Sequence, residues 1–322
     1  MPLLSIRFMG NRIIYLDNLK CFAILIVMMG HTTMFLSYEY RAWNPLLAII
    51  QSFQMPLFMA ICGFFFRKAL DMPFVPFVYK KFVALLLPAI CWSFIKYAMS
   101  GGGNLEKTVL YEYWFLRSAF VCYLVCYLMV KVVKSEWLAY LLIIIASIYL
   151  DMYFVKLDLN LMLPSFVFGV VYSLYCDVIK RYRVPLLLLS SIVFWFLFVY
   201  WYYPLRPFGK EVMSQLYIYN LLRFFVGLTA SLAIILIFTW QNRTTKIIAY
   251  IGASTLTFYV LNCIFSDVLR YTKRIAGIED LSMTANYGFS LIIVAVQIPL
   301  FYVITYIIRL NRWSRILLLG NR

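Results

Sequence analysis

The residues of this chain that are best suited to chemistry lie on one short stretch near its N-terminus. His31 is the only histidine, it follows Lys20 by eleven positions, and Asp17 lies three positions before Lys20. At about 100° per residue, an α-helix brings Lys20 and His31 to within about 20° of each other and separates them by about 16 Å along its axis. Asp17 lies about 40° from His31 by the same rule. The spacing predicts an acid, a cation and an imidazole on one helical face.

The ordinary pKa of histidine, about 6.5, makes His31 the strongest candidate for general acid–base catalysis at neutral pH. Lys20 is suited to holding phosphate or a developing oxyanion. Two structural interpretations stay open at this point. His31 could be a buried histidine satisfied by a hydrogen bond, and Lys20 and Asp17 could anchor a helix end by extending their charges to the membrane surface.

The composition is that of a membrane protein. Of the 322 residues, 65% are hydrophobic and 13% are charged, and the mean hydropathy is +0.87. A soluble domain of this length needs a larger polar surface. The apolar run from Cys21 to Met29 is too short to cross a bilayer, which takes roughly 20 residues, so the first span must include charged or polar neighbours. The repeated long apolar runs predict an all-α polytopic protein rather than a barrel.

Ten transmembrane helices fit the apolar runs, and we expect residues 1–322 to form a single membrane-embedded domain. An even number of spans places both termini on one side, and the loops on that side carry about twice as many Lys and Arg residues as the others, so both termini are predicted to be cytoplasmic. The predicted spans are 15–37, 46–66, 82–99, 113–133, 137–154, 161–178, 184–203, 216–240, 246–266 and 284–308.

The formal charge of +16 is explained by basic loops beside a lipid bilayer, and we expect no nucleic-acid partner. The seven cysteines lie in or beside apolar segments without a CxxC pair, so we expect neither a disulfide framework nor a metal site.

Further polar residues stand at the ends of the predicted spans. Lys80 and Lys81 precede the third span and could bind phosphate, although basic residues are also expected there by topology alone. Glu112, Trp114 and Arg117 at the start of the fourth span could form a sugar-binding edge, or could anchor the helix at the interface.

Arg223 lies inside the eighth predicted span. An intramembrane cation needs a partner or a water-filled path, so Arg223 either lines a pore or forms a structural ion pair.

Taken together, these segments resemble the integral-membrane acyltransferase family 3. The similarity begins with Leu16-Asp17-Asn18-Leu19-Lys20 followed by His31, since that family has a basic residue, ten residues and then a histidine in its first span. The later similar segments are Gln54-Met55-Pro56-Leu57-Phe58, Lys80-Lys81 before Leu86-Leu87-Pro88, Trp114-Phe115-Leu116, Pro164-Ser165-Phe166-Val167-Phe168-Gly169, and Ile251 to Leu261.

The chain departs from the family pattern at three positions. Lys20 stands where many members have arginine, which keeps the charge but not the forked guanidinium. Cys62 replaces a common serine and lacks its hydroxyl. Asn262 stands where many members have histidine, so this site can form hydrogen bonds but cannot titrate.

The resemblance implies an acyltransferase of a bacterial cytoplasmic (inner) membrane. Such an enzyme transfers an acyl group, most commonly acetyl from acetyl-CoA, to a hydroxyl of a cell-envelope or exported glycan. No bound cofactor is implied, since acetyl-CoA is a co-substrate. His31 would be the general base or a covalent acyl carrier, assisted by Lys20 and Asp17.

The resemblance also suggests where the two substrates bind. The donor phosphates would bind near Lys80, Lys81 and Arg67. The acceptor side or pore would be lined by Trp114, Glu112, Arg117, Arg223, Tyr259 and Asn262. The alternative is a transporter or flippase of a glycan or lipid-linked intermediate, because many spans with buried charges suit that class as well.

Overall fold

The computed structural model describes residues 13–36, 44–102, 104–150, 157–202, 216–277 and 281–320. Within these ranges the chain consists of helices and the turns that connect them. The helices are α1 (Ile14–Leu36), α2 (Pro45–Phe64), α3 (Arg67–Leu70), α4 (Phe74–Lys81), the π-helical turn η1 (Phe82–Leu86), α5 (Leu87–Met99), α6 (Leu105–Tyr111), α7 (Trp114–Val133), α8 (Glu136–Ile148), α9 (Leu159–Arg181), α10 (Arg183–Tyr202), α11 (Leu216–Phe238), α12 (Lys246–Gly252), α13 (Thr255–Ile275), α14 (Met283–Leu310) and α15 (Arg312–Leu319).

The predicted all-α, multi-pass membrane fold is confirmed. Eight helical segments of the described chain are long and apolar enough to cross a membrane, and a ninth is added if the bent pair α12 and α13 is one span. Helix α8, which matches the fifth predicted span, has 13 residues, fewer than the roughly 20 that a bilayer requires. The count of ten spans therefore stays a prediction, as does the cytoplasmic location of both termini.

The third predicted span starts earlier in the structure, and the ninth is broken, and each difference has a physical reason. The third begins at Phe74 rather than 82, because α4, η1 and α5 continue into one another as a segment of 26 residues. Pro76 does not prevent this, since a proline is tolerated in the first turn of a helix. The ninth span is broken, with a bend of 73° between α12 and α13. Gly252 at this break lies directly against the backbone carbonyl of Asp17 on α1.

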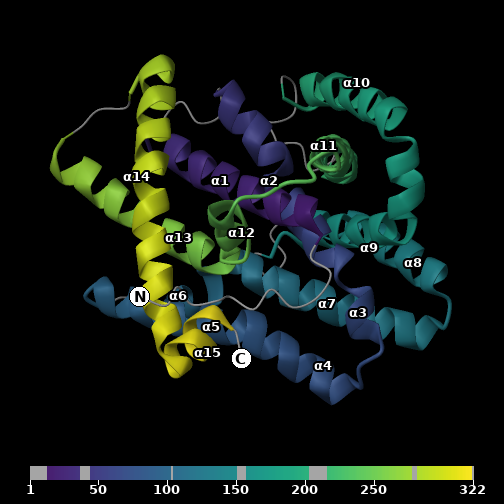
Figure 1. The fold of residues 1–322 in the computed structure, drawn as a ribbon, viewed down its shortest axis with the longest axis horizontal. Coiled ribbons are helices and arrows are strands. Elements are labelled where there is room, and N and C mark those ends of the chain that lie inside the picture. Colours follow the sequence, from purple (N-terminus) through teal and green to yellow (C-terminus); the bar gives the residue numbers. More distant parts are fainter. Residues whose placement is uncertain are drawn as a thin grey trace.

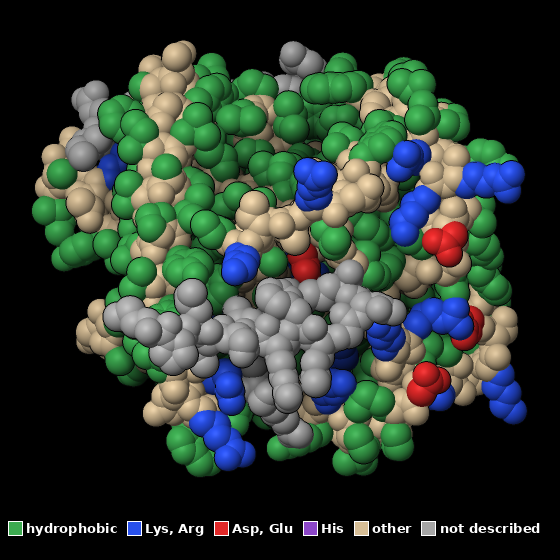
Figure 2. All heavy atoms as spheres, in the orientation of Figure 1, with side chains coloured by type: hydrophobic (Ala, Val, Ile, Leu, Met, Phe, Trp, Pro, Cys, Tyr) green, Lys and Arg blue, Asp and Glu red, His purple; other side chains and the backbone are tan. Residues whose placement is uncertain are grey.

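Helix α1 is the central element of the fold. It is surrounded by α2, α11, α12, α13 and α14, and it runs through the middle of the bundle behind α14 (Figure 1). Most of its side chains are buried, because other helices surround it on several sides. The outer surface is also largely apolar, and Lys, Arg and a few acidic side chains interrupt it on part of the face shown in Figure 2. The polar residues of α1 are therefore held inside a protein environment.

Helices α2 and α9 cross with their backbones in contact. A Cβ placed on Gly63 would collide with the Phe166 carbonyl, and a Cβ placed on Gly169 would collide with the Ala60 carbonyl. Small residues at such positions let membrane helices approach closely, because van der Waals packing replaces the hydrophobic driving force. This contact fixes α2, and with it one side of α1.

Replacing Gly169 by alanine should destabilise the protein. The added methyl group has to separate α2 from α9, and overpacking of this kind typically costs about 1–3 kcal/mol. The midpoint of thermal unfolding in detergent should therefore fall. Gly288→Ala on α14 is the matched control, since a Cβ at that position meets nothing within 4 Å. An equal loss of stability in the two variants would contradict the assignment of Gly169 to a tight crossing.

Candidate active site

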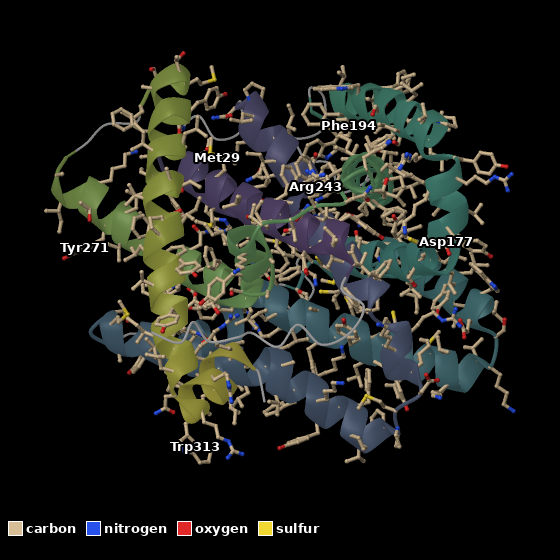
Figure 3. The ribbon with its side chains drawn as sticks, viewed as in Figure 1. Met29, Asp177, Phe194, Arg243, Tyr271 and Trp313 are labelled. Atoms are coloured by element: carbon tan, nitrogen blue, oxygen red, sulfur yellow. The ribbon has the colours of Figure 1, made fainter. Side chains whose placement is uncertain are left out.

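His31 lies in the second half of α1, which packs against α14. Met29, two positions before His31, is labelled in Figure 3. Its ring is partly buried. The imidazole Nδ1 is 2.9 Å from the backbone carbonyl oxygen of Val27. Because a carbonyl can only accept, Nδ1 carries the proton, and Nε2 of the neutral ring keeps its lone pair. Nε2 is therefore the atom that can take a proton from a substrate.

Helix α2 packs closely beside this end of α1. A Cβ placed on Gly30 would lie 2.9 Å from Gln54 Oε1, so the Gln54 amide rests against the residue before His31. Gln54 Oε1 is buried without a hydrogen-bond partner among the described residues. A buried amide oxygen without a partner can accept a hydrogen bond from water or from a ligand hydroxyl.

Lys20 lies nearer the other end of α1, where Asp17 and Phe65 are close to its ammonium group. Its ammonium is 3.9 Å from the Asp17 carboxylate, and it lies 4.6 Å from the centre of the Phe65 ring just after α2. The ion pair shows that Lys20 and Asp17 share a face of α1, as their spacing predicts. The Phe65 ring adds a cation–π contact that draws Lys20 against the protein.

Lys81 is the second cation of this region. Its ammonium lies 3.3 Å from the centre of the Tyr123 ring on α7. The Tyr123 hydroxyl donates to the Cys62 carbonyl at 2.8 Å, and both Lys20 and Lys81 act electrostatically on the Cys62 thiol. The structure thus brings Lys20 and Lys81, here called the lysine pair, to one neighbourhood beside the end of α2.

The other two residues predicted for the donor take different positions. Lys80 is exposed. Arg67 lies 3.9 Å from Glu136 at the start of α8, and both side chains are substantially exposed. An exposed pair of this kind contributes little to stability. The lysine pair is therefore the more enclosed cationic site.

Near the His31 end of α1, three charged residues from separate elements meet. The Lys96 ammonium on α5 is 2.6 Å from the Glu112 carboxylate and 2.5 Å from the Asp267 carboxylate. Glu112 precedes α7, and Asp267 belongs to α13. We call these three residues the Lys96 cluster. Its ion pairs connect three elements that are distant in the sequence.

The backbone at Tyr113 turns the chain between Glu112 and α7. Tyr113 has a φ of 52°, a left-handed conformation that is uncommon for residues other than glycine. Its ring is buried, and its centre lies 6.4 Å from that of Tyr259 on α13. Burial first, and then the neighbouring Cys263, Glu112 and Asp267, raise the pKa of Tyr113 well above its ordinary value. Tyr113 therefore stays neutral beside the cluster.

Several residues predicted for the acceptor lie around this turn. Arg117 donates from Nη2 to the Glu112 carbonyl at 3.1 Å. The Tyr259 ring lies 5.9 Å from that of Phe115 on α7, and Trp114 is partly buried next to Phe115. The structure thus brings Glu112, Arg117 and Tyr259 together, with Trp114 at the start of the same helix.

Asn262 lies one turn after Tyr259 on α13 and is completely buried. Neither its amide nitrogen nor its amide oxygen has a hydrogen-bond partner among the described residues. Buried amides are normally satisfied, so an unsatisfied one indicates a place for water or for a ligand.

Arg223 is engaged in an ion pair. Its two terminal nitrogens donate to the two carboxylate oxygens of Asp158 at 2.7 and 2.8 Å. Asp158 has a φ of 52° and lies just before α9. This geometry agrees with the interpretation of Arg223 as a structural ion pair, and its role in the acceptor path stays a prediction.

Arg223→Gln should lower stability, because it leaves a partly buried carboxylate without its bidentate partner. Hydrogen bonds to charged groups contribute about 1.5–3 kcal/mol each. Thermal unfolding in detergent would measure the loss, and Asp158→Asn in the same background should then cost little more, since the two residues act as one unit. Fully additive losses would contradict the pairing.

Lys96 and Asp267 were not among the residues predicted from the sequence. Lys96 lies within the third predicted span, so the rule that identified Arg223 as an intramembrane cation applies to it as well. Asp267 lies one position beyond the ninth predicted span, where a carboxylate looks like an ordinary loop residue. Its partner is on α5, and sequence periodicity carries no information about contacts between helices.

The fold and the site together define a multi-pass membrane protein in which a partly buried histidine lies on the same helix as the lysine pair's Lys20 and near the Lys96 cluster. Residues 13–308 match the family model described as an acyltransferase domain. The chain belongs to this acyltransferase family.

The chain is also similar to the nodulation protein NolL of Mesorhizobium japonicum, with 29% identity over 131 residues. This match covers 36% of the chain and 35% of that protein's length. No solved structure matches the chain.

Proposed function

We propose that the protein is a membrane O-acyltransferase that transfers an acyl group, acetyl from acetyl-CoA, to a hydroxyl of a cell-envelope or exported glycan. The family assignment supports acyl transfer. The observation that carries the chemical proposal is the state of His31, whose Nδ1 is held by the Val27 carbonyl so that Nε2 is left as the base.

In the proposed reaction, Nε2 of His31 takes the proton of the acceptor hydroxyl while the hydroxyl oxygen attacks the thioester carbonyl. The new C–O bond forms, the C–S bond breaks, and the departing CoA thiolate receives the proton from the imidazolium. In the alternative order, Nε2 attacks the thioester, the C–S bond breaks and the CoA thiolate departs, which leaves an acyl-imidazolium on His31. The acceptor hydroxyl then takes the acyl group as the N–C bond breaks, and its proton passes to the CoA thiolate. In both orders His31 is the catalytic residue.

The donor phosphates are proposed to bind at the lysine pair. Lys20 and Lys81 are the enclosed cations near Cys62, and ammonium groups bind phosphate as point charges. Lys80 and Arg67 would contribute at the more exposed entrance. The thioester would then extend along α1 toward His31, with Asp17 holding Lys20 in place.

The acceptor is proposed to approach the opposite end of the site, near Trp114, Glu112, Arg117, Tyr259 and Asn262. Unsatisfied amide atoms at Asn262 and Gln54 supply hydrogen-bonding groups that a sugar hydroxyl can use. With both termini in the cytoplasm of a bacterium, this arrangement takes the donor from inside and the acceptor from outside the inner membrane.

The test is acyl transfer by membranes that contain the protein. Membranes are incubated with acetyl-CoA labelled in its acetyl group and with envelope glycans from a deletion strain, and the glycans are then examined by mass spectrometry. Label in the glycan supports the proposal. Movement of unmodified glycan across the membrane without label transfer would instead identify a transporter or flippase.

A further inference from the structure

The contacts between α1 and α13 fix how the two helices lie along each other near His31. The Arg270 guanidinium lies 4.4 Å from the centre of the Phe35 ring. Lys273 donates from Nζ to the carbonyls of Phe35 and Leu36, at 3.5 and 3.2 Å. One helical turn, about 5.4 Å, back along each helix leads to Asp267 on α13 and to His31 on α1. In agreement with this register, the Asp267 charge acts electrostatically on the His31 imidazole.

The charged groups around this end of α1 come from α13, α5 and the turn before α7. Asp267 is paired with Lys96 at 2.5 Å and lies 3.8 Å from Arg270. Glu112 shares Lys96 at 2.6 Å. Lys273 completes this set at the end of α1.

The other elements packed on α1 present neutral groups near His31, or meet α1 elsewhere. From α2 comes the Gln54 amide beside Gly30. From α14 come Asn286 and Ser290, which form hydrogen bonds with Thr33. Helices α11 and α12 contact the first half of α1, through Phe238 on Phe22 and Gly252 on Asp17. Among the charged residues around this end of α1, Asp267 is therefore the one that acts on His31, and Lys96 and Arg270 are its own ionic partners.

We propose that Asp267 is a positioning residue that acts through His31 by stabilising its protonated form during acyl transfer, and that Lys96 tempers this effect by balancing the Asp267 charge. The inference rests on the proposed function. When His31 Nε2 takes the proton of the acceptor hydroxyl, the imidazolium forms within the electrostatic reach of a carboxylate that is already held in place by an ion pair. Proton transfer is favoured without movement of the protein.

The two partners should act in opposite directions on the pH dependence of the reaction. A general base loses activity at low pH because it becomes protonated. Asp267→Asn removes the negative charge, so His31 stays neutral to lower pH, and the acidic limb of the rate profile should move down by about 1 pH unit. Lys96→Gln removes the balancing positive charge and should move the same limb toward higher pH. A purely structural role would not produce shifts of opposite sign.

The experiment measures initial rates of acetyl transfer against pH for the full-length protein in membranes. Asp267→Glu keeps the charge and should keep the limb near its original position. Asp177→Asn is the matched control for loss of a carboxylate, since Asp177 is exposed on α9, and it lies on the opposite side of the molecule from Tyr271 on α13 (Figure 3).

Limb shifts of opposite sign in Asp267→Asn and Lys96→Gln would support the proposal. Unchanged limbs, shifts in one common direction, or an equal shift in Asp177→Asn would overturn it. The underlying function has its own test, because it fails if a His31→Ala protein transfers acetyl at the normal rate. A protein that depends on His31 but shows no shift in the two cluster variants would refute only the role of Asp267.

Discussion

His31→Ala is expected to abolish detectable acyl transfer while leaving the protein folded in the membrane. The alanine removes Nε2, the atom proposed to accept the hydroxyl proton, and general base catalysis typically contributes about 10²- to 10⁴-fold to a rate. The fold should persist, because the ring forms its hydrogen bond within α1, to Val27, rather than to another helix. The measurement is the turnover of purified protein with acetyl-CoA and the glycan acceptor.

Two controls make this result informative. Size-exclusion chromatography and thermal unfolding in detergent should match those of the wild type, which separates a loss of chemistry from a loss of structure. Val27 supplies only its backbone carbonyl, so Val27→Ala keeps the hydrogen-bond acceptor and should retain turnover, with some loss of stability because Val27 is fully buried. A His31→Ala protein with wild-type turnover would refute the proposed chemistry.

Lys81→Ala is expected to raise KM for acetyl-CoA about tenfold or more and to leave kcat much less affected. The expected change in KM follows from the loss of a charge-assisted contact, which contributes about 1.5–3 kcal/mol to binding. A tenfold change in KM corresponds to about 1.4 kcal/mol, so the loss of this contact is large enough to produce it. A change confined to KM indicates binding that is equally strong in the ground state and the transition state. Lys80→Ala should have a smaller effect, because Lys80 is exposed whereas Lys81 packs on Tyr123.

A truncated donor tests whether the lysine pair binds phosphate. Acetyl-pantetheine carries the same thioester without the phosphates, so wild type and Lys81→Ala should use it equally well. Lys20→Ala should behave in the same way, with an added effect if Lys20 also steadies oxyanion charge. An unchanged KM for acetyl-CoA in both variants, or the same defect with acetyl-pantetheine, would refute the assignment of the donor site.

The sequence was most informative about single helices. The spacing of Asp17, Lys20 and His31 defines a face from the helical period alone, and the ion pair between Asp17 and Lys20 agrees with it. Apolar runs likewise identified the membrane fold. The sequence did not predict the break between α12 and α13. A hydropathy profile carries no information about the direction of a helix axis, and the residues on both sides of a bend are equally apolar.

Contacts between distant elements were the part that the sequence could not supply. Lys96 appears in the sequence to be one cation in a long apolar segment, and Asp267 appears to be a loop carboxylate, whereas in the fold their side chains meet. Arg67 and Lys81 looked equivalent as basic residues after α2, yet one pairs with Glu136 at the surface and the other packs on Tyr123. Which charge turns inward depends on the tertiary contact, and composition near a helix end does not determine it.

The contact between α2 and α9 limits how this protein can open. Because backbone touches backbone at Gly63 and at Gly169, the two helices leave no room for a lipid tail or an acyl chain between them and should move as one rigid unit. Phe65 follows directly on α2, so one side of the environment of Lys20 belongs to that unit. Any passage that widens to admit a thioester must therefore form elsewhere than between α2 and α9, and the bent pair α12 and α13 borders one such place beside α1.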